Sequence, residues 1–508
     1  MNYRSLPAWF RKLPPMLSGL AVASLAGGLF ATLASLSDVS VALLLFAGTI
    51  AVACFACFPV FGLLTMAGLA PVERFGRLTN DGSEFTFSVM RAAGLVLVIV
   101  FVVHWLLLKR RFRFPPSLLW YGAYMALGVM SLTWTSDLQY GRNQTAMQLG
   151  NLLFFFVVLN MVNSLKKARL LLAVWLCVVC AIGVFTIYKW HSDSGGIVAD
   201  EDYYLRGGGL TTGERYAAVL YDPPSYAQRQ RRAIGTTSHP GAYGIDLLLA
   251  LPIYVYFFRT TQSRLLRILV SAAALVAVYN VFLTNTRAVL VTFGVITLYA
   301  LITGFLRMRV WFVALTLAAA AVAFTYAPPD LRDRLLSFDQ YFKQGREASF
   351  GERLYLMKVS VDLISESPLF GVGLGNQVDV AERGKLDWRD RSRSAHNDFI
   401  ATWLEVGLVG LVLVVGFLVS IYRRYRLGER VGLDLNEPRL FLLTNAARVQ
   451  FFAILVFGLQ GEPLTQPIKG FWLTAGIVVA LTESMIENAM RNERASVQPP
   501  APELEAGG

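Results

Sequence analysis

Apolar runs of about 20 residues recur along the chain and are separated by short charged stretches. Each run is long enough to cross a hydrocarbon core of about 30 Å as a helix. Barrel strands would alternate in polarity and would be about half as long, so the runs predict transmembrane helices. The predicted spans are 16–36, 39–70, 88–108, 117–135, 144–163, 169–190, 238–258, 266–284, 287–306, 310–327, 399–421, 441–459 and 468–487.

The stretch 39–70 is long for one crossing, and Pro59 could divide it into a helical hairpin. The pattern therefore predicts an all-α, polytopic integral membrane protein with about 12–14 transmembrane helices. Lys and Arg collect in loops that stay in the cytoplasm. From Lys109 onward, basic clusters fall at every second loop, so all of them can be cytoplasmic together. Two long loops, 191–237 and 328–398, then face the other side of the membrane.

This topology divides the chain into six predicted segments: N-terminal transmembrane helices at 1–190, a first large periplasmic loop at 191–237, central transmembrane helices at 238–327, a second large periplasmic loop with the candidate catalytic motif at 328–398, C-terminal transmembrane helices at 399–490, and a disordered cytoplasmic tail at 491–508. Any chemistry must be built from helix ends and the two large loops, because no stretch of the sequence indicates a separate soluble catalytic domain.

Composition supports the membrane assignment. Of the 508 residues, 55% are hydrophobic and only 16% are charged, whereas soluble globular chains average about 25% charged residues. The net charge of +12 would suggest nucleic acid in a soluble protein, but cytoplasmic loops account for it here, and no nucleic-acid partner is expected. No cluster of His, Cys and acidic residues indicates a metal site, and no cofactor motif is present.

Histidine is rare in the chain, and one of its four histidines stands where the second large loop meets a predicted helix. This is His396, in the sequence Ser394–Phe399. Asn397 and Asp398 follow it, and both residue types favour the N-cap of a helix. One interpretation is a helix cap with an incidental histidine. The other is a functional residue at the membrane face.

Several arginines stand at predicted outer helix ends or in the two large loops, where the distribution of basic residues does not predict them. They are Arg142, Arg232, Arg287 and Arg353. An arginine close to the hydrocarbon region is costly without an anionic partner, and the guanidinium fork matches the oxygens of pyrophosphate. The alternatives are pairing with nearby Asp or Glu, or with phospholipid headgroups. The glycine-rich run Gly371–Gly375 has no nucleotide-binding fold around it, so it is interpreted as a flexible loop turn.

Six motifs, taken together and in this order, resemble the bacterial O-antigen ligase and O-antigen polymerase superfamily. They are Arg232 with Gly235–Pro240, Thr284–Ala288, Gly351–Arg353, Ser367–Asn376, Ser394–Phe399 and Glu405–Gly410. The resemblance implies a fold of the GT-C type in the bacterial inner membrane. It also implies metal-independent transfer of a glycan from undecaprenyl pyrophosphate to an acceptor hydroxyl on the periplasmic side, during polysaccharide biosynthesis.

The resemblance also implies roles for individual residues. His396 matches the loop histidine of the family, and Arg287 and Arg232 match its pyrophosphate-binding arginines, with Arg142 and Arg353 as further candidates. Asn397, Asp398 and Glu405 support the motif. The acceptor is expected to be lipid A-core or a second glycan, so ligase and polymerase both stay open. A transporter of lipid-linked sugars is a third hypothesis. It would be expected to show inverted repeats, and none is evident in the sequence.

Overall fold

The computed structural model describes residues 54–55, 57–72, 89–107, 109, 111–192, 232–237, 239–306, 349–375, 380, 383, 396–464 and 468–497. The predicted spans 16–36 and 310–327 and most of the two large loops lie outside these residues. The elements of the described part are α3 (Pro59–Leu69), η3 (Ala70–Val72), α4 (Val89–Leu107), α5 (Pro116–Ser131), α6 (Leu138–Met161), α7 (Leu165–His191), α10 (Pro240–Thr260), α11 (Arg264–Leu283), α12 (Arg287–Ile302), α16 (Ser349–Glu366), α18 (Asp398–Asp434), α19 (Pro438–Gly458) and α20 (Lys469–Val497).

Seven helices are long and apolar enough to cross a membrane: α6, α7, α10, α11, α18, α19 and α20, the last over Lys469–Met490. Shorter apolar helices occupy Pro59–Val72, Arg91–Leu107 and Arg287–Ile302. The prediction of an all-α polytopic membrane protein is confirmed. The total of about 12–14 helices stays a prediction, because the predicted spans 16–36 and 310–327 and part of 39–70 are not described.

The chain forms two compact units. The first contains residues 1–63 and 95–110, and the second contains residues 64–94 and 111–508. Within the first unit, the rings of Phe101 and Trp105 lie 4.8 Å apart, and Phe55 and Leu97 are buried. All the predicted site residues belong to the second unit, which is described below.

Local sequence explains where several helices of the second unit begin. The side chains of Asp137, Ser164 and Ser263 accept hydrogen bonds from backbone N–H groups in the first turns of α6, α7 and α11. Helices α5, α10 and α19 begin with proline, whose fixed φ suits a first turn.

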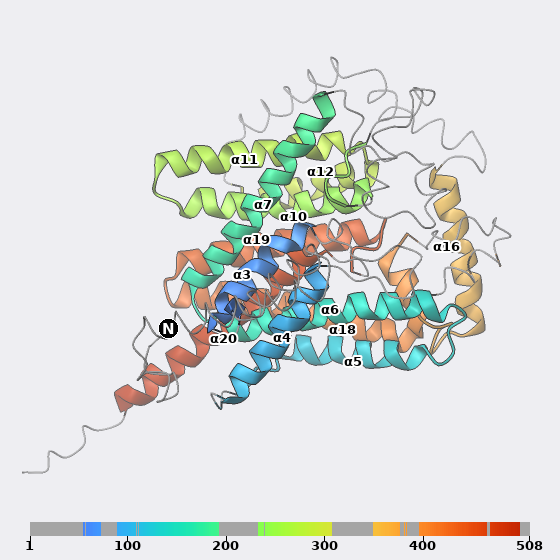
Figure 1. The fold of residues 1–508 in the computed structure, drawn as a ribbon, viewed down its shortest axis with the longest axis horizontal. Helices are drawn as coiled ribbons and strands as arrows, with labels where there is room; N and C mark the ends of the chain where they lie inside the picture. The colour runs from blue at the N-terminus through green and yellow to red at the C-terminus, as the bar shows by residue number, and fades with distance from the viewer. Residues whose placement is uncertain are drawn as a thin grey trace, which may run out of the picture. The chain divides into compact units, whose positions relative to one another are not determined.

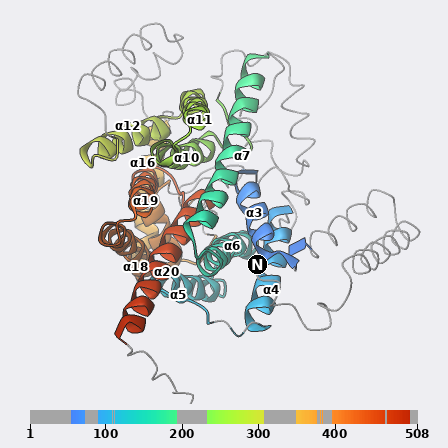
Figure 2. The same cartoon turned by 90° about the vertical axis from the view of Figure 1, so that its left-hand side faces the viewer.

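Helix α19 lies between two groups of helices in the second unit. It packs against α10 and α12 on one side and against α18 and α20 on the other. Figure 2 shows α10, α11 and α12 together on one side of α19 and α5, α6 and α18 on the other. In Figure 1, α5, α6 and α18 run alongside one another, and α16 is steeply inclined to them at one end. The ends of α19 are therefore well placed to join the two groups.

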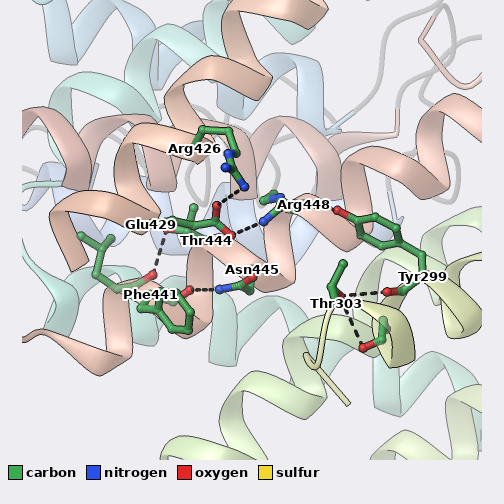
Figure 3. Close-up of polar contacts among 10 residues, drawn as sticks. Tyr299, Thr303, Arg426, Glu429, Phe441, Thr444, Asn445 and Arg448 are labelled. Carbon is green, nitrogen blue, oxygen red and sulfur yellow. Dashed lines mark hydrogen bonds and ion pairs between the residues drawn. The ribbon is translucent and has the colours of Figure 1, made fainter. Parts of the chain in front are cut away.

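A charged cluster joins α12, α18 and α19 (Figure 3). Glu429 of α18 is 7% exposed and forms ion pairs with Arg448 of α19 and, at 3.4 Å, with Arg426. The second nitrogen of the Arg448 guanidinium donates to the hydroxyl of Tyr299 in α12 at 2.9 Å. A buried carboxylate requires such partners, because an unpaired charge is expensive in a low-dielectric interior.

Ion pairs also explain why two helices run past their predicted ends. Helix α18 continues from the predicted end at 421 to Asp434, and Arg424 pairs with Glu483 of α20 at 2.6 Å. Helix α20 reaches Val497, so residues 491–497 are helical where a disordered tail is predicted. On α20, Glu487 pairs with Arg113 at 2.7 Å. Charged residues here extend the helices beyond the apolar pattern that defines the predicted spans.

Candidate active site

His396 has an unusual backbone conformation directly before α18. Its φ is 49°, in the left-handed region that non-glycine residues rarely adopt. The N-cap is Asn397, whose side-chain oxygen accepts from the N–H groups of Phe399 at 3.0 Å and Ile400 at 3.1 Å. Asn397 therefore caps α18, and the half-buried side chain of His396 does not. Residues held in such conformations are often found at functional sites.

The turn that follows α19 is fixed by three of the predicted residues. Asn397 donates through Nδ2 to the carbonyl of Leu459 at 3.3 Å, and Arg353 donates to the carbonyl of Gln460 at 3.4 Å. The N–H of Leu464 lies 3.3 and 3.2 Å from the two carboxylate oxygens of Asp398, which is 1% exposed. The structure thus brings the Arg353 motif and the His396 motif to one turn, residues 459–464.

The end of α19 also contacts the segment around His239. The ring nitrogen Nδ1 of His239 accepts from the N–H of Gly241 at 2.9 Å, so His239 is the N-cap of α10. A Cβ at Gly241 would lie 3.4 Å from the ring of Phe457, and one at Gly458 would lie 2.9 Å from Asp398. The approach at Gly458 leaves no room for a Cβ, and the one at Gly241 is an ordinary van der Waals contact. Together they place the start of α10 and the start of α18 at the same end of α19.

Arg232 and Arg287 belong to backbone segments that are bonded to each other. The N–H of Ala233, next to Arg232, donates to the carbonyl of Leu283 at 2.9 Å. Leu283 ends α11, and Arg287 is the first residue of α12 after a tight turn in which Asn285 has a φ of 44°. Both arginines are half-buried. The two arginines that the family resemblance assigns to pyrophosphate therefore belong to neighbouring backbone segments.

Glu405 connects α18 to the first turns of α6. Its carboxylate is 5% exposed and accepts two hydrogen bonds from Nε2 of Gln144, at 2.8 and 2.9 Å. The backbone N–H of Gly375 donates a third hydrogen bond to this carboxylate. Arg142 lies two residues before Gln144 and is exposed. The first turns of α6 thus carry both a candidate anion-binding arginine and a buried partner of the histidine motif.

The glycine-rich run Gly371–Gly375 fills a break in α18. Gly407 interrupts this helix with φ 70° and ψ −174°. The N–H groups of Val372 and Gly373 donate to the carbonyls of Leu404 and Glu405 at 2.9 Å each, and the N–H of Leu408 donates to Pro368 at 2.9 Å. The run therefore supplies hydrogen bonds that the helix loses at its break. It is a docked segment, where the sequence suggests a flexible turn.

Three glycines let this segment approach its neighbours. Gly371, Gly373 and Gly375 have φ values of 71°, 101° and 92°, and a Cβ at Gly375 would lie 2.6 Å from the backbone nitrogen of Gly141 in α6. The hydroxyl of Thr135 donates to the carbonyl of Leu374 in the same segment. The segment thereby ties the break in α18 to the turn between α5 and α6.

Sequence reasoning missed two parts of the site. One is α16, which lies inside the predicted second large loop. Its buried residues Leu356, Val359, Leu363 and Ile364 have helical spacing and pack with Leu404 of α18. The other is the polar face of α6, formed by Gln144, Gln148 and Asn151, all of which are buried. Polar residues every three or four positions in an apolar stretch were the available signal.

Two of the other histidines lie elsewhere. His191 ends α7 and bonds the hydroxyl of Tyr279 at 3.0 Å. His104 belongs to the first compact unit. Within the described residues, no three His, Cys, Asp or Glu side chains gather as a metal site would require.

Comparison with models of protein families finds a match in the central part of the chain. Residues 247–415 match the family model described as O-antigen ligase. This stretch begins within α10 and ends within α18, so it contains Arg287, Arg353, His396 and Glu405, whereas Arg142 and Arg232 lie outside it. No curated protein matches the chain.

Proposed function

We propose that this chain, a member of the O-antigen ligase and polymerase superfamily through its residues 247–415, transfers a glycan from undecaprenyl pyrophosphate to an acceptor hydroxyl on the periplasmic side of the bacterial inner membrane. Membership supports a glycosyltransferase-like ligase or polymerase in general. The donor, the acceptor, the side of the membrane and the mechanism are parts of the proposal. The preferred acceptor is lipid A-core, which makes the enzyme a ligase.

One observation supports the proposal most strongly. The segments of His396, Arg353 and His239 meet at the end of α19, although they lie far apart in the sequence. His396 itself has a φ of 49°. It is not the N-cap of α18, because Asn397 is. A strained histidine beside a turn fixed by its neighbours is the arrangement expected of a positioned catalytic group.

The proposed chemistry assigns His396 as a general base. It would take the proton of the acceptor hydroxyl while the acceptor oxygen attacks the anomeric carbon and the bond to the pyrophosphate breaks. Histidine titrates near the operating pH, and general-base assistance is typically worth about 10²–10⁴-fold in rate. Direct displacement at the anomeric carbon inverts its configuration. No metal ion takes part in this proposal.

Arg287 and Arg232 are proposed to bind the pyrophosphate and to stabilise the negative charge that grows on it as it leaves. Their segments are joined by the bond from Ala233 to Leu283, which supports a shared task. Arg142 and Arg353 are proposed as further pyrophosphate contacts. Arg353 also holds the turn after α19, so its loss would disturb both binding and the position of that turn.

The periplasmic orientation is supported by the charged ends of the helices. The pairs Arg424–Glu483 and Arg113–Glu487 lie at the end of the bundle where the basic clusters occur. The segments of His396 and Arg287 belong to helix starts that follow the predicted outer loops. A donor carried on a lipid suits that side, because nucleotide sugars are confined to the cytoplasm.

Two alternatives make different predictions. A polymerase would use a second carrier-linked glycan as the acceptor, with the same base and arginines. A transporter would need polar groups that line a path across the membrane, and the site residues identified here gather instead at helix starts and in one turn.

Reconstitution distinguishes these readings. The purified full-length protein is mixed with undecaprenyl pyrophosphate-linked glycan in EDTA, with and without lipid A-core. The proposal predicts a glycan-bearing lipid A product that forms only with the core acceptor. Longer carrier-linked chains without core would instead establish the polymerase. No product in either mixture would contradict the proposed transfer.

A further inference from the structure

Two arginines from different helices are held against one turn, the turn that joins α10 to α11. Nη1 of Arg169, early in α7, donates to the hydroxyl of Thr260 at 3.1 Å. Nε of Arg267, in the first turn of α11, donates at 2.7 Å to the carbonyl oxygen of the next residue, Thr261. Two guanidinium groups are therefore fixed near consecutive residues, and like charges held close together repel each other.

The helices around this turn contain no acidic side chain that could neutralise the pair. The sequence has no aspartate or glutamate at residues 138–192 or 247–329, so α7, α11, α12 and all but the start of α10 lack carboxylates. Glu437, at the start of α19, is close enough to act on the hydroxyl of Tyr256, but within the described residues it forms no ion pair with either arginine. Arg439 beside it adds a further positive charge. The neutralising anion therefore has to come from outside these helices.

Other basic residues gather at the same end of the helices. Arg169 contacts the turn before α11, and further along both helices Nδ2 of Asn280 in α11 donates to the carbonyl of Gly183 in α7 at 3.1 Å. Helices α7 and α11 therefore begin at the same end. Neither has an acidic residue in its first turn, although the helix dipole favours one there. The basic residues of these two starts and of the end of α10 are Lys166, Lys167, Arg169, Arg259, Arg264 and Arg267.

The arginine pair is more ordered than the orientation of a membrane protein requires. Basic residues commonly collect on one side of a membrane, but that tendency does not require guanidinium groups fixed by hydrogen bonds. The guanidinium of Arg169 lies near the hydroxyl of Tyr256, and 5.9 and 5.4 Å from the ring centroids of Tyr256 and Phe257. In the described part of the chain, the two Nη groups of Arg267 have no hydrogen-bond partner. They are therefore available to an anion with several acceptor oxygens.

An exposed apolar surface continues directly from this basic turn. Only 17% of the most apolar stretch of α11 is buried inside the protein. Leu170 of α7 and Phe258 of α10 are exposed next to the turn as well. The exposed apolar side chains in the first two turns of α11 are Leu265, Leu266, Ile268 and Leu269. A basic turn joined to an apolar face matches a phospholipid, whose phosphate is attached to acyl chains, whereas a soluble anion would use only the basic part.

We propose that Arg169 and Arg267, held at Thr260 and Thr261, bind the phosphate of an anionic phospholipid whose acyl chains lie along the exposed face of α11. Guanidinium groups bind phosphate oxygens in pairs, and basic sites between membrane-spanning helices bind anionic headgroups. The bound phosphate removes the repulsion between the two arginines and joins α7 to the turn between α10 and α11. This site does not depend on the proposed glycan transfer.

The test measures binding of phosphatidylglycerol to the purified full-length protein in detergent by native mass spectrometry. The wild type should hold one phosphatidylglycerol more tightly than further copies, and more tightly than phosphatidylcholine. Arg169→Gln and Arg267→Gln should each weaken this first site about 5-fold, the effect of one basic group at an anionic surface. Arg430→Gln is the matched control, because it removes the same charge from an exposed arginine of α18, and it should leave the first site unchanged.

Thermal unfolding separates lipid binding from a purely structural role of the arginines. Phosphatidylglycerol should raise the melting temperature of the wild type and of Arg430→Gln, because a ligand that binds only the folded state stabilises it. Arg169→Gln and Arg267→Gln should lose most of this rise. A lower melting temperature without lipid, combined with an unchanged rise on adding lipid, would show a structural role and overturn the proposal.

The binding measurement can overturn the proposal in two further ways. An equal loss of affinity in Arg430→Gln would show that only the overall charge matters, and wild-type affinity in both Arg169→Gln and Arg267→Gln would show that the arginine pair does not bind the lipid. Competition tests the occupant. Displacement of phosphatidylglycerol by inorganic phosphate, or equal binding of phosphatidylcholine, would overturn an anionic phospholipid as the ligand of this site.

Discussion

Gln144 of α6 donates two hydrogen bonds to the buried carboxylate of Glu405 in α18, 261 residues further along the chain. The Gly375 amide completes this set of donors. One side chain therefore joins three parts of the candidate site: the histidine motif, the glycine-rich segment and the start of α6. The site depends on long-range contacts of this kind.

Replacing Gln144 with Leu should destabilise the protein by about 1–3 kcal/mol, because the carboxylate of Glu405 would be left buried with one hydrogen bond in place of three. Thermal unfolding in detergent measures this loss. Arg142→Ala is the control on the same helix, and its exposed side chain predicts little change in stability. Equal melting temperatures for Gln144→Leu and the wild type would show that the contact contributes nothing.

Gly407→Ala should prevent stable folding of α18. A Cβ there would lie 2.1 Å from the carbonyl oxygen of Leu369, and the φ of 70° is strained for alanine. Gly122→Ala and Gly294→Ala are matched controls in helices, because a Cβ at either position meets no atom within 4 Å. They should be neutral or slightly stabilising, since alanine favours helices by up to about 1 kcal/mol over glycine. The yield of monodisperse protein from membranes compares the three variants.

Asn397 has two functions that two substitutions separate. Asn397→Ala removes the cap of α18 and should cost about 1 kcal/mol. Asn397→Asp keeps a capping oxygen, so it should retain the stability of α18. It has no side-chain N–H group, so it should lose the hydrogen bond to the carbonyl of Leu459 in the turn after α19. We predict a reduced transfer rate for Asn397→Asp at near-normal melting temperature. A normal rate would mean that the turn does not need this bond.

Glycine at position 396 should be more stable than alanine there. The φ of 49° strains any residue with a Cβ, and relief of a left-handed conformation is worth about 1 kcal/mol. His396→Gly should therefore melt above His396→Ala, with both inactive in transfer. The reverse order of melting temperatures would contradict the left-handed conformation of His396.

The length of the apolar runs was sufficient to predict those helices whose side chains are apolar along almost their whole length. The span predicted at 169–190 is α7, Leu165–His191, and the span at 266–284 is α11, Arg264–Leu283. The predicted start of α6 is six residues late, because residues 138–143 contain a glycine and four polar or aromatic residues and resemble a loop in the sequence. The break at Gly407 is hidden in an apolar run, since only the docked segment Gly371–Gly375 makes it possible.

The candidate site was predictable in its parts and not in its assembly. Motif resemblance identified His396, Arg287 and Glu405 individually. Their arrangement depends on α19, whose end carries no motif and contacts the segments of His239 and Asp398 through small residues.

The most direct test of the account is chemical rescue of the His396→Gly protein in the reconstituted transfer reaction. The removed side chain is replaced in solution by imidazole, and the rate of glycan transfer to lipid A-core is followed with and without it. The account predicts a rate at least about 10²-fold below the wild type without imidazole and a dose-dependent recovery with it, since a general base acts through its free imidazole. Transfer at the wild-type rate by His396→Gly alone would contradict the assignment of His396 as the base.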